Sequence, residues 1–481
     1  MTNRFKGNPY PIIVMAAVVL VIEAVSLRLG TAGVVIIAVL LAFAAVALVV
    51  NFDANKAGMG ASLLACFTLT WNGWYVGPLR PGDVLILLAL MLFLIGDAGR
   101  PLSTPPWWIK QLAFAVVLIA ILHILLPTDP HYLAGRTVIT GAGKATVSTK
   151  GSIAGANLGV AFKFVVAVFV LPMVLTFAAH QNRRSPRWLA IAFAGGSAAS
   201  GYAAMAGKLG LGKIAQLITH IPPAPGRQFG FALHPNFLAA GLTICVPLAM
   251  WLAVSEGRRD RVLGCVMLPG LLLGVYASGS RGGTVCVVLA LVLSFVLLPR
   301  ARAYAPMVGI GLAVLAASVF AAFPSFGLSI LRATRIIGGI STSGSDLLRS
   351  IVAHQGVLDF YHSPVDGIGL QVATEAQNVY LQELASGGLI LFSAMVIYSL
   401  GLMVTAGLMI KRHDLAAALL TVGVVIAALN FFEADLTDRF YYVPAAILVA
   451  LVYADKLEDD EAAAAQPQAA PESRALSRRA R

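Results

Sequence analysis

Arginine in a short glycine-rich stretch is the first feature of this chain that could do chemistry. Residues Ser278–Gly283 read SGSRGG and place Arg281 between two apolar runs. A guanidinium keeps its charge and presents a planar fork of donors that matches phosphate oxygens. Flanking glycines let a ligand approach the backbone N–H groups at the start of the next helix. The stretch therefore predicts a phosphate site; an arginine that only contacts lipid headgroups is the alternative.

A second polar group precedes this stretch. Arg227 is followed by His234, Pro235 and Asn236, directly before another apolar run. Proline suits the first turn of a helix, and asparagine can satisfy the free backbone groups there. His234 has no partner at metal-ligand spacing, so we predict no metal site.

The segment 324–378 is the only long run that is not membrane-like, and it carries the densest polar chemistry in the chain. Its candidate functional residues are Asp346, Arg349, Glu375, Gln377 and Asn378. Polar side chains gathered at the end of a membrane span are more often functional than incidental. Asp435 and Asp438, near the start of the last apolar run, are further candidates on the same predicted face.

The composition indicates what positions these residues. Of 481 residues, 59% are hydrophobic and 12% charged, and the mean hydropathy is +0.85. Such a chain is an all-α integral membrane protein, and its apolar runs predict a bundle of about 12–14 transmembrane helices. The net charge of +12 comes from basic residues in short loops, so it does not indicate nucleic-acid binding. The four cysteines lie within apolar runs and predict neither disulfides nor a metal site.

The predicted spans follow from the apolar runs. They lie near 10–29, 31–52, 57–76, 82–98, 107–126, 156–179, 187–206, 235–254, 261–278, 283–298, 304–323, 379–410, 414–432 and 440–454. Four short basic loops then fall on one side, which the positive-inside rule makes cytoplasmic. The segments 127–155, 207–234 and 324–378 face outward. We expect a membrane domain over 1–454 and a disordered cytoplasmic tail over 455–481.

Four sequence elements, taken in order, resemble the O-antigen ligase and O-unit polymerase superfamily. They are Arg227 with His234-Pro235-Asn236, then Ser280-Arg281-Gly282, then Asp346 and Arg349 leading to Ser363–Gly369, then Gln377–Gln382 running into Gly387-Gly388. The resemblance covers roughly 225–440, and the first half of the chain matches only in being hydrophobic.

The resemblance implies a specific activity. Members of this superfamily are bacterial glycosyltransferases of the cytoplasmic (inner) membrane, similar to the C fold class. At the outer face they transfer or polymerise glycans carried on polyprenyl (undecaprenyl) diphosphate. The implied partners are that donor, a glycan or lipid-glycan acceptor, and membrane lipids, with no metal, cofactor or nucleic acid. Arg281, Arg349 and Arg227 would then bind the donor diphosphate.

One departure from the superfamily concerns catalysis. Ligases have His-Asn where this chain has Gln377-Asn378, and glutamine cannot take up a proton at physiological pH as histidine can. Glu375 is our first candidate for the missing base, Asp435 or Asp438 the second, and His354 or His362 the third. A further alternative is that little base catalysis is needed once arginines neutralise the leaving diphosphate.

Other functions stay open at this point. A transporter or flippase of lipid-linked glycans would suit so many spans, although it should place charged residues at mid-membrane in both halves. A non-catalytic member that only binds lipid-linked glycan would explain Gln377. The sequence also leaves open whether the acceptor is another glycan, as for a polymerase, or a different molecule, as for a ligase.

Overall fold

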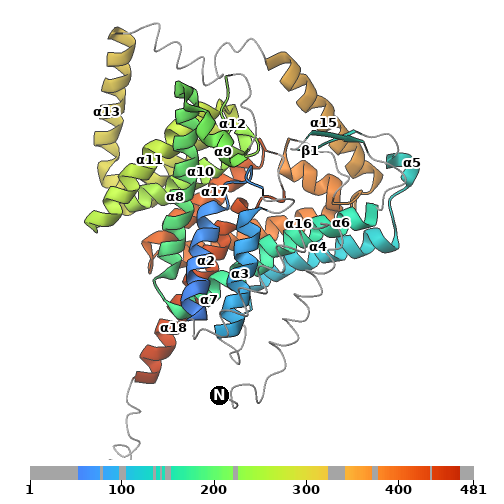
Figure 1. Cartoon of the computed structure of the whole chain (residues 1–481), viewed down its shortest axis with the longest axis horizontal. Helices are drawn as coiled ribbons and strands as arrows, with labels where there is room; N and C mark the ends of the chain where they lie inside the picture. The colour runs from blue at the N-terminus through green and yellow to red at the C-terminus, as the bar shows by residue number, and fades with distance from the viewer. Residues whose placement is uncertain are drawn as a thin grey trace, which may run out of the picture.

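The computed structural model describes most of the chain beyond residue 52 (Figure 1). The described residues are 53–75, 80–96, 104–133, 137–140, 143–146, 153–219, 226–322, 342–370, 377–433 and 436–465. Two of the predicted spans, 10–29 and 31–52, therefore lie outside them.

The predicted apolar runs from residue 57 onward each contain a helix, because only a helix satisfies its own backbone groups in hydrocarbon. These helices are α2 (Ala54–Thr68), α3 (Pro81–Gly96), α4 (Trp107–Leu125), α6 (Ile153–Val165) continued by η1 (Val166–Val170) and α7 (Leu171–Gln181), α8 (Ser185–Ala206), α10 (Pro235–Ala253), α11 (Arg258–Ser278), α12 (Arg281–Leu297), α13 (Pro299–Ala322), α16 (Val379–Met409), α17 (Asp414–Leu429) and α18 (Val443–Ala465). The chain is an all-α polytopic membrane protein, as predicted.

Fewer helices than predicted are long and apolar enough to cross a membrane unaided. Among the described residues there are 7, or up to 8 if the bent pair α12 and α13 forms one span. The helices α3 and α17 are apolar but shorter. α16 has 31 residues, and it accommodates its length by a break at Gly388 rather than by running straight.

The core forms around α10. Of the apolar stretch of this helix, 94% is buried inside the protein. The helices α8, α11, α12 and α17 pack against it. Small residues permit the closest helix contacts: a Cβ on Gly201 of α8 would lie 2.1 Å from the carbonyl oxygen of Gly270 on α11. Glycine at such a crossing lets two backbones approach, which is how helices associate in lipid.

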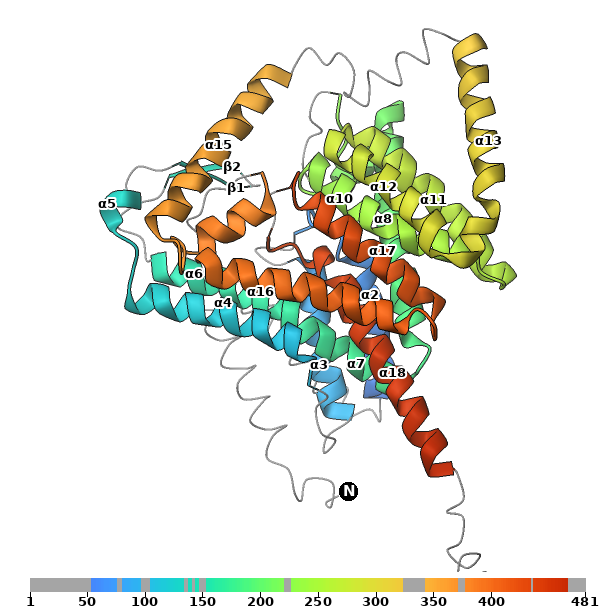
Figure 2. The same cartoon turned by 180° about the vertical axis from the view of Figure 1, so that it is seen from behind.

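A group of elements covers one end of the bundle; we call it the outer cap because the sequence predicts that it faces outward. It consists of α15 (Thr342–His362), α5 (Pro130–Leu133) and a hairpin of β1 (Thr137–Thr140) and β2 (Gly143–Thr146), which gather beside α4, α6 and α16 (Figure 2). The ring of Tyr132 stacks on that of His362, with 3.5 Å between centroids. The two segments predicted to face outward, 127–155 and 324–378, thus meet. The hairpin is a short exception to the all-α prediction.

The predicted start of the disordered tail is wrong. α18 continues past residue 454 to Ala465, because its alanine and glutamate residues favour helix. Arg412 also binds Asp455 (2.5 Å) and Asp459 (2.9 Å) on this extension. Residues 466–481 lie outside the described part of the chain.

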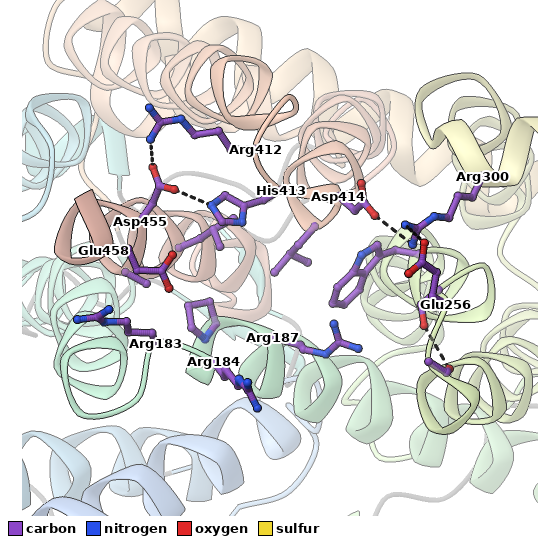
Figure 3. Close-up of a pocket in the computed structure, with 17 residues that line it drawn as sticks. Arg183, Arg184, Arg187, Glu256, Arg300, Arg412, His413, Asp414, Asp455 and Glu458 are labelled. Carbon is purple, nitrogen blue, oxygen red and sulfur yellow. Dashed lines mark hydrogen bonds and ion pairs between the residues drawn. The ribbon is translucent and has the colours of Figure 1, made fainter. Parts of the chain in front are cut away.

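The basic loops predicted to share one side of the membrane do come together. Figure 3 shows the cavity where they meet; its volume is about 460 Å³, and arginines from three different turns line it. These are Arg183, Arg184, Arg187, Arg300 and Arg412. Carboxylates balance several of them: Glu256 and Asp414 bind Arg300 (2.8 and 3.3 Å). Ion pairs between the residues that line this cavity therefore connect the helix ends that surround it.

Candidate active site

Arg281 stands at the first position of α12, where α11 ends. Gly279 ends α11 in the left-handed conformation (φ 62°), and the Ser280 hydroxyl caps α12 by accepting from the Gly283 N–H (3.2 Å). Steric crowding requires glycine in this turn, because a Cβ on Gly282 would lie 2.7 Å from the side chain of Phe432. The SGSRGG stretch is therefore a tight turn that presents an arginine beside a helix N-terminus, which favours an anion.

Arg227 joins this turn to the start of α10. Its Nε donates to the carbonyl oxygen of Ser278 (2.9 Å), and its Nη2 donates to Oδ1 of Asn236 (2.6 Å). The cap of α10 is His234, whose Nδ1 accepts from the Asn236 N–H (3.2 Å). Asn236 was the expected capping residue; instead it holds Arg227 in place.

Two titratable groups share the field of two arginines. Burial lowers the pKa of His234 to about 4, and the charges of Arg227 and Arg349 add to that effect. Burial raises the pKa of Glu433 to about 8, opposed by the charges of Arg349 and Arg227. Four groups from well-separated parts of the sequence therefore belong to one electrostatic site. Arg349 comes from α15, so the outer cap contributes to it.

Gln377 and Asn378 begin α16 at the same end of the bundle. Asn378 caps the helix by accepting from the Leu381 N–H (3.1 Å). Gln377 has φ 55° and is the one non-glycine residue with positive φ in the described part of the chain. Such strained positions concentrate at functional sites. The N–H of Val379 donates to the carbonyl oxygen of Asn430 (2.8 Å), which ties this helix start to the loop carrying Glu433.

The predicted turn after α15 docks into the break in α16. The N–H groups of Leu389 and Ile390 donate to the carbonyls of Pro364 and Val365 (2.9 and 3.2 Å). A Cβ on Gly388 would lie 2.3 Å from the Val365 backbone. The two glycine motifs of the sequence therefore pack against each other, which holds the turn after α15 against α16.

Several predicted site residues are engaged elsewhere or not described. Asp438 is fully buried and paired with Arg80 and Asn72, so its carboxylate has a structural role. His362 stacks on Tyr132. Glu375 and Asp435 lie outside the described residues, as does the side chain of Asp346.

The sequence alone assigned no chemical role to two residues of this site. Glu433 was not among the candidates, and His234 was only part of a motif without a partner at metal-ligand spacing. The available signal for Glu433 was an acidic residue just after an apolar run, on the side predicted to face outward.

A family model described as O-antigen ligase (Wzy_C) matches residues 263–393. The matched region runs from α11 into α16 and includes Arg281, Arg349 and Gln377. No curated protein matches the chain. The family match confirms the predicted resemblance to the O-antigen ligase superfamily.

Proposed function

We propose, from this match to an O-antigen ligase family model, that the chain transfers or polymerises a glycan carried on polyprenyl diphosphate. The reaction takes place at the outer face of a bacterial inner membrane and needs no metal. The observation that carries the proposal is the site itself: Arg227, Arg281 and Arg349 belong to three separate segments that meet at one end of the bundle.

The arginines bind the donor diphosphate. Arg227 is held by Ser278 and Asn236, so its guanidinium is oriented before any ligand arrives. A guanidinium has five N–H donors and can therefore hold the protein and a phosphate oxygen at the same time. Positive charge placed where the leaving diphosphate develops its own charge stabilises the transition state.

The residues at the start of α16 receive the acceptor. Gln377 orients the acceptor hydroxyl by hydrogen bonding, and Asn378 fixes the helix start beneath it. Glu375, two residues before Gln377, stays a candidate proton acceptor, together with Asp435. Asp346 stays a possible site residue, three residues before Arg349 in the sequence.

A second candidate function is a member that binds lipid-linked glycan without transferring it. Gln377 is the observation that favours it, since the superfamily's histidine is missing there. A transfer assay separates the two: a binder holds a polyprenyl-diphosphate glycan but releases no polyprenyl diphosphate.

The test of the proposed function is reconstitution in liposomes with a polyprenyl-diphosphate oligosaccharide donor. Release of polyprenyl diphosphate coupled to glycan transfer is expected; binding without release supports the second candidate. Lipid-linked glycans in a deletion strain then identify the acceptor class. Single repeat units indicate a lost polymerase, long unattached chains a lost ligase, and material trapped inside a lost transporter.

A further inference from the structure

Glu433 is a buried carboxyl group in the proposed reaction site to which nothing above assigns a role. Its side chain is 2% exposed, and its N–H donates to the Leu429 carbonyl (3.1 Å), which continues the end of α17. The preceding residue, Phe432, packs against Gly282 beside Arg281. Asn430, three residues earlier, accepts from Val379 next to Asn378. Glu433 therefore lies between the proposed diphosphate site and the start of α16.

The environment of Glu433 differs from that of a simple counter-ion. A carboxylate that only balanced arginines would have a lowered pKa. Burial instead outweighs Arg349 and Arg227 and raises the pKa of Glu433 to about 8. A carboxyl group that titrates near neutral pH is matched to proton transfer.

We propose that Glu433 accepts the proton of the acceptor hydroxyl, in place of the histidine absent at Gln377. This step rests on the proposed function. The acceptor oxygen forms a bond to the anomeric carbon while the bond from that carbon to the diphosphate oxygen breaks. Polyprenyl diphosphate leaves with the electron pair, and the hydroxyl proton passes to the Glu433 carboxylate.

The pH dependence of transfer isolates this group. The charges acting on Glu433 are those of Arg349 on α15 and Arg227 before α10. Arg281 lies at the start of α12, next to Gly282, which Phe432 contacts. Arginine stays charged across the working range, and His234 has a pKa of about 4. Glu433 is therefore the group from which we expect a transition near pH 8, and the variants below test that assignment.

If Glu433 is the base, transfer must increase with pH. A base works when deprotonated, so transfer should rise with pH through about 8. Bound diphosphate adds negative charge and shifts the pKa of Glu433 further upward. The rate therefore has a rising limb, the pH range over which transfer increases. This limb should lie at higher pH in kcat, which reports the enzyme with bound substrate, than in kcat/KM, which reports the free enzyme.

The experiment compares pH profiles of transfer from a polyprenyl-diphosphate oligosaccharide by reconstituted full-length variants. Glu433→Gln should lower the rate about 10²-fold and abolish the rising limb, while donor binding persists. Glu433→Asp should retain the limb at a reduced rate. Glu383→Gln is the matched control. It removes another fully buried carboxyl, on α16, whose two oxygens have no hydrogen-bond partner in the described part of the chain, and it should keep the limb.

The outcomes separate two failures. A Glu433→Gln variant that keeps the limb, or more than about half of wild-type turnover, overturns the inference alone. A limb lost in Glu375→Gln but not in Glu433→Gln also overturns it and returns the role to Glu375. Wild-type protein that transfers nothing from the lipid-linked donor overturns the proposed function and the inference together.

Discussion

Arg281 matters through the shape of its side chain as well as its charge. It starts α12 at a turn whose glycines leave no room for side chains, with Phe432 against Gly282. Lysine there would keep the charge but lose the planar fork that binds two phosphate oxygens at once. A change that preserves charge therefore tests bidentate binding directly.

We predict that Arg281→Lys weakens donor binding about tenfold or more, and that Arg281→Ala weakens it further, on the scale of a hydrogen bond to a charged group. Binding of a polyprenyl-diphosphate oligosaccharide to purified protein measures both. Arg300→Lys is the control, because Arg300 lines the separate ion-paired cavity (Figure 3). This variant should bind the donor normally. Unchanged binding in Arg281→Ala would remove this residue from the diphosphate site.

Asp438 shows why an acidic residue near the site is not necessarily catalytic. It is fully buried and bonded to Arg80 and Asn72. Removing one partner of a buried ion pair leaves the other charge uncompensated.

We predict that Asp438→Ala lowers the free energy of unfolding by about 3–5 kcal/mol, measured by thermal unfolding in detergent. Asp53→Asn is the control, because Asp53 pairs with Lys56 at the surface, and it should leave unfolding unchanged. Normal stability of Asp438→Ala with lost transfer would instead return Asp438 to the catalytic candidates.

The sequence identifies candidate functional residues from local motifs, but it does not predict which residues they contact in the folded protein. Arg227 and Arg281 stand in recognisable local patterns, and both belong to the site. The contribution of Glu433 depends on contacts with residues far away in the chain, such as Arg349 on α15. No spacing rule brings such positions together, so Glu375, close in sequence to Gln377, was the natural first choice.

Among the elements, the broken helix α16 does the most to position the site. The chain after α15 inserts at the break and bonds to both sides of it: Ile368 to Ala385 (2.9 Å), and Leu389 to Pro364 (2.9 Å). Gly388 makes this possible with φ 59° and ψ −155°, a conformation open essentially to glycine alone. The break therefore couples the cap to the start of α16.

We predict that Gly388→Ala destabilises the protein by about 1–3 kcal/mol or more, from backbone strain and from contact with Val365. Transfer should fall with it, because the cap loses its anchor. Gly407→Ala is the control on the same helix, since a Cβ there meets nothing within 4 Å; its effect should be within about 1 kcal/mol. Thermal unfolding and transfer, measured side by side, check both; equal behaviour of the two variants would contradict the prediction.

The sequence predicts elements well where hydrophobicity decides them. The apolar runs identify the helices because each span must bury about 20 residues in hydrocarbon. It does not reveal the break in α16, since Gly387-Gly388 within an apolar run is equally compatible with a close helix contact. The helical extension of α18 was also missed, because the acidic and alanine-rich composition after residue 454 was interpreted as a disordered tail although these residues also favour helix.

For the whole molecule, the two ends differ in chemistry. One end carries the ion-paired cavity of arginines (Figure 3), and the outer cap with α15 and the hairpin gathers elsewhere, beside the start of α16 (Figure 2). The positive-inside rule assigns the first to the cytoplasm. Under the proposed function, the polyprenyl-diphosphate donor would then reach the site from the side of the cap.

We predict that Tyr361 is extracytoplasmic and Glu458 cytoplasmic. Tyr361 is 72% exposed on α15, and Glu458 is exposed on α18, so a cysteine at either position can react once a reagent reaches it. The test uses single cysteines in a background without Cys66, Cys245, Cys265 and Cys286. In intact cells an impermeant thiol reagent should label position 361 alone; after lysis it should label both. Labelling of position 458 but not 361 in intact cells would invert the topology and place the proposed diphosphate site on the cytoplasmic side, which would contradict a reaction at the outer face.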